Sequence, residues 1–294
     1  IADAPNRVGF DYFFGIAASL DMVPYTFIEN DRVTEIIEPV DMLPMLTRRA
    51  SAWVAKQAET TQPFFLYFAL NSPHTPIVPS RAWQGKSGLG MYGDFVMQTD
   101  AGFGAILDAI DTPVTLVGHS MGGYLIQQYL LQDSAAAAVL MASVPPQGLV
   151  PTTAWLAFTN PLLFHQIQLL QWLGPQTVFA MYGIDGGRRP LFSPHLADHK
   201  VREYTSRAQL ESPQAIFEMS LPLGSRRDDA PTVNALVLGA ELDSLIPSAA
   251  IHSTANAFDT EAVFIPELGH AMMLDHHWRD AASKIYDWLN QQDM

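Results

Sequence analysis

The chain has 294 residues, of which 48% are hydrophobic and 16% charged, and this composition predicts a folded soluble protein with a large core. The net charge of −14 argues against a nucleic-acid partner, because a phosphate backbone requires clustered Lys and Arg, and no apolar stretch is long enough to span a membrane. The absence of cysteine excludes disulfides, a thiolate nucleophile and Cys-ligated zinc.

The first third of the chain contains two predicted helices and one short predicted strand. Residues 9–33 are aromatic and loop-like, whereas residues 41–59 have apolar side chains at helical spacing. The apolar run 63–70 predicts a strand that ends in the turn-rich sequence NSPHTPIVPS. Residues 93–111 predict a second helix. The side chains expected to face inward from this helix are Val96, Phe103, Ile106 and Leu107.

After Thr112, strands and helices alternate, and this rhythm is typical of a parallel α/β sheet. The predicted strands are residues 114–117, 136–142, 232–239 and 261–267. The predicted helices are residues 121–131, residues 247–258 and a closing helix that extends through Trp288. Residues 149–223 interrupt the alternation, and we expect them to form a separate block that is mainly helical.

The first of these strands runs directly into the sequence GHSMG at residues 118–122, which fits the G-x-S-x-G turn that carries a nucleophilic serine. Such a turn holds the serine in a strained conformation, and we expect any Cβ at Gly118 or Gly122 to crowd the neighbouring strand and helix. The Ser120 hydroxyl would then project from the carboxyl edge of the sheet. The N–H of Met121, at the start of a helix, would donate to an oxyanion.

Two later residues have the positions that a catalytic triad requires. Asp243 follows the third predicted strand and His270 follows the fourth, so the chain order is Ser, Asp, His. The alternative is that Asp243 caps the next helix and that His270 is an ordinary loop histidine. Glu241 is a second candidate for the acidic position.

Other polar residues near these motifs are weaker candidates. His119 lies beside the serine, and we expect its side chain to point away from the site and to pack in the core. Asp275, His276 and His277 resemble a metal cluster, but adjacent residues on a helix diverge by about 100°. We therefore expect no metal site and no cofactor.

Four stretches after Thr112 carry a resemblance to a known family: TPVTLVGHSMGG, AAAVLMASVPPQG, NALVLGAELDSLIP and PELGHAMMLDHHW. On these motifs, residues 112–294 resemble the α/β-hydrolase family, in particular its lysophospholipase-like and esterase-like members. The resemblance implies a mainly parallel sheet, a helical cap at about residues 149–223 and a small-molecule ester substrate. Taken singly, each large apolar cap residue is better explained by core packing than by substrate contact. As a group, they suggest an acyl-chain pocket built from Trp155, Phe158, Phe164, Trp172, Phe179 and Met181.

Residues 1–111 resemble a different family, the sulfatases. The stretches NRVGFDYFFGIAASLDMVPYTFIENDRV, PFFLYFALNSPHTPIVPS and WQGKSGLGMYGDFVMQTD are similar to the middle of arylsulfatases. A sulfatase needs a formylglycine made within a C/S-x-P-x-R motif, and the chain contains no such motif. One active-site position of the sulfatases can be carried over to this chain, and it corresponds to His74. In the family, the residue at this position contacts the sulfate. We expect His74 to be a loop residue in this chain.

The chain therefore reads as a composite: an incomplete, non-catalytic sulfatase-like segment followed by an α/β-hydrolase domain that lacks its first strands. We expect the strand at 64–70 to pair with the hydrolase sheet in their place. The family's second oxyanion donor comes from a loop that begins His-Gly, and this dipeptide is absent. Losing one such donor costs about 10²–10³ in kcat. Asn71 or Ser72 would be the substitute.

Three functions follow from this reading. The first is a cofactor-free serine hydrolase of carboxylic esters, with its activity impaired by the missing oxyanion loop. The second is a catalytically inactive composite, and the third, most remote, is a sulfate-ester hydrolase. The printed chain starts at Ile1 without a signal peptide, so we expect a fragment or a processed form. The compartment and the oligomeric state stay open.

Overall fold

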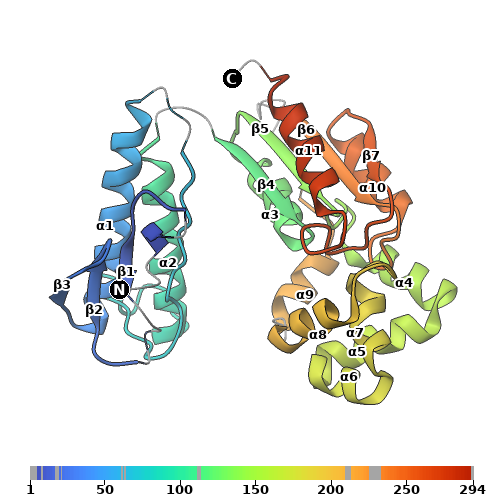
Figure 1. The fold of residues 1–294 in the computed structure, drawn as a ribbon, viewed down its shortest axis with the longest axis horizontal. Helices are drawn as coiled ribbons and strands as arrows, with labels where there is room; N and C mark the ends of the chain where they lie inside the picture. The colour runs from blue at the N-terminus through green and yellow to red at the C-terminus, as the bar shows by residue number, and fades with distance from the viewer. Residues whose placement is uncertain are drawn as a thin grey trace. The chain divides into compact units, whose positions relative to one another are not determined.

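The chain divides into two compact units, Ile1–Thr112 and Pro113–Met294, which are described separately below (Figure 1). This division falls one residue after the expected join. No described helix combines the length and the apolar character needed to cross a membrane. The computed structural model describes residues 5–292 except 8, 17–19, 21, 61, 63, 111–113, 209–212 and 225–232.

The first unit contains a small antiparallel sheet that the sequence did not predict. Its strands, in the order β1-β2-β3, follow a 3-10 turn at Pro5–Arg7 and are Phe14–Ile16, Thr26–Glu29 and Arg32–Ile36. Asn30, in the link between β2 and β3, has φ 57°, a value that asparagine tolerates in tight hairpins. The loop-like interpretation of residues 9–33 was therefore wrong, because aromatic side chains also suit short, half-buried strands.

Two helices, α1 (Pro39–Ala58) and α2 (Met91–Leu107), pack against each other in this unit. Both predicted helices are thus present. Gly102 allows the close approach, because a Cβ there would lie 2.9 Å from the hydroxyl oxygen of Thr47 on α1.

The inward face of α2 differs from the predicted one. Ile106 is buried as expected. The other three predicted residues are exposed: Val96, Phe103 and Leu107. The buried face instead carries Gln98, which accepts a hydrogen bond from the Ser80 N–H at 2.7 Å, and Thr99, which donates to the Phe95 carbonyl at 2.7 Å. Because these polar groups find partners, they can be buried, and the helix is rotated relative to its apolar pattern.

Residues 64–70 form no strand, and the sheet of the second unit, as far as it is described, consists of four strands that all follow residue 114. The proposed pairing of 64–70 with that sheet was therefore wrong. Leu66 and Phe68 pack with the helix residues Ala50, Val54 and Ile106 instead. The side chains of Leu66 and Phe68 pack against helices, and the backbone of residues 64–70 does not pair with a strand.

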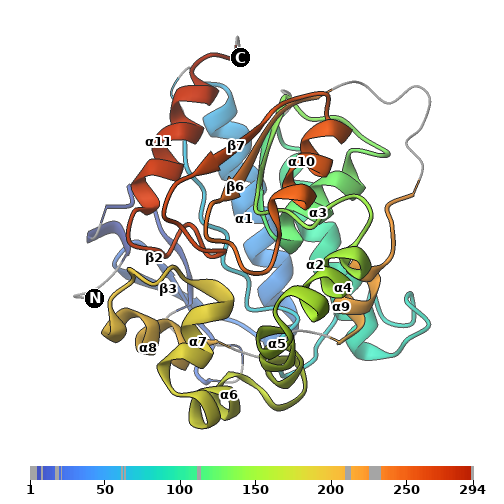
Figure 2. The ribbon, with the colours of Figure 1, turned by 90° about the vertical axis from the view of Figure 1, so that its right-hand side faces the viewer.

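The second unit is built on a parallel sheet with the order β4-β5-β6-β7. The strands are Thr115–His119, Ala137–Met141, Asn234–Ala240 and Ala262–Ile265. The flanking helices are α3 (Met121–Tyr129), α10 (Ser248–Ala257) and α11 (Trp278–Leu289). Helices α3 and α10 cover one face and α11 covers the other, so that β5 is buried completely (Figure 2). The predicted α/β class is confirmed.

Between β5 and β6, the described residues form a group of short helices beyond the carboxyl ends of the strands (Figure 1). We call this group the cap. Its helices are α4 (Leu149–Thr159), α5 (Pro161–Leu173), α6 (Pro175–Tyr182), α7 (Ile184–Leu191), α8 (Asp198–Arg207) and α9 (Pro213–Ser220).

Candidate active site

The turn between β4 and α3 holds Ser120 at φ 53° and ψ −112°, a strained conformation for a residue with a side chain. A Cβ on Gly118 would lie 2.5 Å from the Gly122 carbonyl, as the motif predicts. The expectation for Gly122 itself was wrong, because a Cβ there would meet no described atom within 4 Å. The second tight position is Gly123, where a Cβ would lie 2.4 Å from the Ser143 hydroxyl oxygen.

The fold brings Ser120, His270 and Asp243 together. The Nε2 atom of His270 lies 3.0 Å from the Ser120 hydroxyl oxygen, and its Nδ1 atom lies 2.8 Å from a carboxylate oxygen of Asp243. His270 is buried, with 4% of its surface exposed. Because the carboxylate can only accept, Nδ1 carries the proton and Nε2 is left to accept from the serine hydroxyl.

The other carboxylate oxygen of Asp243 accepts hydrogen bonds from the main-chain N–H groups of Leu245 and Ile246, at 2.8 and 2.9 Å. The side chain thus organises the loop after β6 and contacts the histidine at the same time. Glu241, the alternative acid, accepts instead from the N–H of Glu267 at 3.0 Å.

His119 has a polar contact that the sequence did not predict. Its Nε2 donates to the main-chain oxygen of His270 at 2.8 Å, and the two rings lie 4.8 Å apart. Burial, followed by the nearby His270 ring, lowers the pKa of His119 to about 4. The sequence analysis expected a packing residue and did not predict this hydrogen bond. The partner is a main-chain atom far along the chain, and no sequence motif indicates such a contact.

Asp275 is a second polar anchor that the sequence analysis did not identify as such. Its buried carboxylate accepts hydrogen bonds from the N–H groups of Ser193, Gly269 and His276, at 2.7, 2.9 and 2.8 Å. Burial alone would raise the pKa of Asp275, but these backbone hydrogen bonds lower it below its usual range. The carboxylate ties the loop that carries His270 to the segment after α7.

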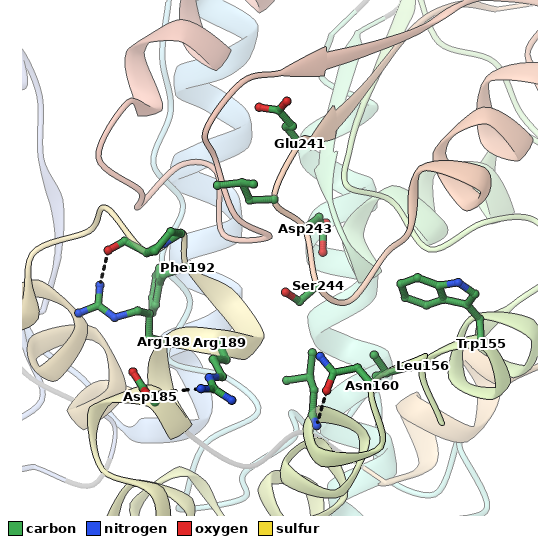
Figure 3. Close-up of a pocket in the computed structure, with 13 residues that line it drawn as sticks. Trp155, Leu156, Asn160, Asp185, Arg188, Arg189, Phe192, Glu241, Asp243 and Ser244 are labelled. Carbon is green, nitrogen blue, oxygen red and sulfur yellow. Dashed lines mark hydrogen bonds and ion pairs between the residues drawn. The ribbon is translucent and has the colours of Figure 1, made fainter. Parts of the chain in front are cut away.

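A cavity of about 560 Å³ lies between the cap and the loop after β6 (Figure 3). Asp243 and Ser244 line it from that loop, opposite residues of the cap helices. The cap and nearby residues that line it are Trp155, Leu156, Asn160, Leu163, Asp185, Arg188, Arg189, Phe192 and Pro194.

This lining differs from the predicted acyl-chain pocket. Of the six apolar cap residues proposed for it, only Trp155 borders this cavity. Phe158 and Trp172 are 89% and 75% exposed, and Met181 is also exposed. The cap helices are short and apolar on several faces, so the sequence alone does not indicate which face turns inward.

The residues carried over for other roles lie in the first unit. His74 is exposed, and its Nδ1 atom lies 2.8 Å from the carbonyl of the next residue, Thr75. The hydroxyl oxygen of Ser72 lies 2.9 Å from that of Thr99. Both amide atoms of Asn71 are buried and find no hydrogen-bond partner in the part of the chain that the structure describes.

The argument against a metal site at His276 and His277 assumed that both residues lie on a helix. That assumption was wrong. Both residues precede α11, which begins at Trp278. Their rings are perpendicular, with centroids 4.1 Å apart. Together with Glu267 they place one possible donor atom each within 4.8 Å of one another.

Comparison with known proteins relates the chain to two families. A curated N-acetylgalactosamine-6-O-sulfatase from Bacteroides thetaiotaomicron is 26% identical over 166 residues, which cover 37% of this chain and 32% of that protein. For the N-acetylgalactosamine-6-sulfatase from Sus scrofa, the identity is 33% over 101 residues, with coverage of 34% and 17%. The chain thus spans a third or less of the length of these sulfatases.

Among solved structures, a thermophilic esterase from Thermogutta terrifontis matches with a TM-score of 0.44 and 17% identity, covering 69% of this chain and 72% of the esterase. The sequence model of the Alpha/beta hydrolase family matches residues 37–283. The chain is therefore a composite with a partial likeness to sulfatases, and it belongs to the α/β hydrolase family.

Proposed function

We propose that this chain is a serine hydrolase that cleaves carboxylic esters through an acyl-enzyme. The observation that supports this proposal is the line of hydrogen bonds from Ser120 through His270 to Asp243. The three residues follow three parallel strands of one sheet, β4, β6 and β7, and the serine is strained at φ 53°. A serine, a base and an orienting acid in hydrogen-bond reach are the arrangement that activates a weak hydroxyl nucleophile.

In the proposed reaction, the Ser120 hydroxyl oxygen attacks the ester carbonyl carbon while Nε2 of His270 takes the hydroxyl proton. Asp243 holds Nδ1–H and stabilises the imidazolium that forms. The tetrahedral intermediate collapses, the alcohol leaves with the proton from His270, and the acyl group remains on Ser120. Water then attacks the acyl-enzyme with the same help from His270 and releases the carboxylic acid.

The negative charge on the tetrahedral intermediate would be stabilised by the N–H of Met121. This residue is the first of α3, so its N–H has no acceptor within the helix and lies at the positive end of the helix dipole. The second oxyanion donor is unassigned, and the chain lacks the His-Gly dipeptide that would supply it. A hydrolase with one donor would be about 10²–10³ slower than one with two.

Of the three proposed triad residues, Asp243 alone lines the cavity of about 560 Å³, which is of the size that holds a small-molecule ligand. Trp155 and Phe192 offer apolar surface, and Arg189 offers a charge. Because Asp185 lines the same cavity 3.7 Å from Arg189, the lining offers both charges, and we propose a small ester with a polar part as the substrate class.

The test is labelling of the folded chain by a fluorophosphonate probe, together with hydrolysis of p-nitrophenyl acetate. We expect both in the wild-type chain and in Ser134→Ala, which changes an exposed serine of the same unit, and neither in Ser120→Ala. Absence of labelling in folded wild-type protein would contradict the proposal and favour an inactive composite. Calcium-dependent turnover of p-nitrophenyl sulfate would favour the sulfate-ester reaction instead.

A further inference from the structure

A cluster of two histidines and one carboxylate contains none of the three proposed triad residues. Glu267 lies just after β7, and His276 and His277 lie just before α11, at the two ends of the loop that carries His270. One possible donor atom from each of the three lies within 4.8 Å of the others. We propose that these three side chains form a binding site for a divalent transition metal, with Zn²⁺ as the preferred ion.

The distances suit such an ion after a small adjustment. A tetrahedral zinc ion with bonds of about 2.1 Å needs donor atoms about 3.4 Å apart. Glu267 and His277 are exposed, so their side chains can rotate to close the remaining gap.

Each histidine already has a carboxylate behind one ring nitrogen. Asp275 lies 3.3 Å from Nδ1 of His276, and Asp280 lies 3.6 Å from Nδ1 of His277. A carboxylate within hydrogen-bond distance, as Asp275 is, orients a metal-binding histidine and raises the basicity of its other nitrogen. Asp275 is buried and held by main-chain N–H groups, so this support is rigid.

A further imidazole is within reach for a fourth ligand. The ring of His195, in the segment after α7, lies 5.2 Å from the ring of His276 and is exposed. Water is the alternative fourth ligand, as in zinc sites that have three protein ligands.

The donor set decides the class of ion. Two imidazoles and one carboxylate suit Zn²⁺, Co²⁺ or Ni²⁺, whereas Mg²⁺ and Ca²⁺ prefer oxygen ligands throughout. Because the ligands come from both ends of one loop, a bound ion would tie the end of β7 to the start of α11. An ion that binds the folded chain and not the unfolded chain raises the stability of the folded state.

The test is calorimetric titration of the untagged chain, first treated with a chelator, with zinc chloride and separately with magnesium chloride. We expect one Zn²⁺ per chain, a rise in the unfolding temperature with Zn²⁺, and no response to Mg²⁺. Glu267→Gln and His277→Asn should each weaken Zn²⁺ binding at least tenfold.

The matched control is His165→Asn, which removes an exposed histidine of α5 outside the cluster and should leave Zn²⁺ binding unchanged. Circular dichroism of each variant checks that it is folded. The proposal is overturned if the wild-type chain shows no saturable Zn²⁺ binding, or if both Glu267→Gln and His277→Asn bind Zn²⁺ as tightly as the wild type.

Discussion

His119 donates a hydrogen bond of 2.8 Å from Nε2 to the main-chain oxygen of His270. Since a carbonyl can only accept, the proton must reside on this nitrogen of His119. The lowered pKa of about 4 keeps the ring neutral above that pH. His119, at the end of β4, thus holds the backbone of the residue that we propose as the base.

Replacing His119 tests this positioning role. His119→Phe replaces the imidazole with a phenyl ring that has no hydrogen-bond donor. His270 should then shift relative to Ser120, and kcat for p-nitrophenyl acetate should fall about 10- to 100-fold. KM should change little, because His119 contacts the main chain of His270 and acts through the position of that residue. His119→Gln, which retains an N–H donor, should recover part of the loss. An unchanged kcat in His119→Phe would show that the hydrogen bond does not position the base.

The same residue predicts a pH dependence of stability. The pKa of His119 is about 4 in the folded chain, below its ordinary value of 6.5, so the unfolded chain takes up the proton first as the pH falls. The stabilising contribution of neutral His119 to the free energy of unfolding is therefore fully present above pH 6.5. It is lost between pH 6.5 and 4, with a total of about 3 kcal/mol. Urea unfolding at several pH values should show this decline, and His119→Gln should flatten it. An equal decline in His119→Gln would assign the effect to other groups.

The glycines of the elbow provide a matched pair of substitutions. Gly123→Ala should destabilise the chain by about 1–3 kcal/mol, because its Cβ would lie 2.4 Å from the Ser143 hydroxyl oxygen. Gly122→Ala should be neutral or stabilising by up to about 1 kcal/mol, because the position is helical and open. Denaturant unfolding of both variants measures the difference, and equal stabilities would contradict the packing described for this turn.

Asp243 and Glu241, which both follow β6, are the two candidates for the acid beside His270. Replacing each with its amide distinguishes them. Asp243→Asn should lower kcat by about 10⁴, because the neutral amide no longer selects the tautomer with the proton on Nδ1. Glu241→Gln should lower it far less, since Glu241 contacts the Glu267 N–H. The turnover of p-nitrophenyl acetate by each variant checks this. A larger loss in Glu241→Gln would reverse the assignment.

Some elements of this protein follow from short stretches of the chain. The apolar run before GHSMG, the amphipathic spacing at 41–59 and the alternation of strands and helices after Thr112 correspond to β4, α1 and the parallel sheet. The periodicity and turn residues of these elements are local features, so the elements can be predicted without knowledge of the fold. The placement of polar residues after parallel strands also predicted which side chains would meet, because the carboxyl ends of parallel strands share one edge.

Tertiary structure decided the features that depend on distant partners. The buried face of α2 depends on the hydrogen bonds that Gln98 accepts and Thr99 donates, and the apolar run 64–70 packs against helices and forms no ladder. The contact of His119 with the His270 backbone joins residues 151 positions apart. Local sequence determines which secondary structures are favourable, whereas the burial of a polar group depends on a partner that only the folded chain brings within reach.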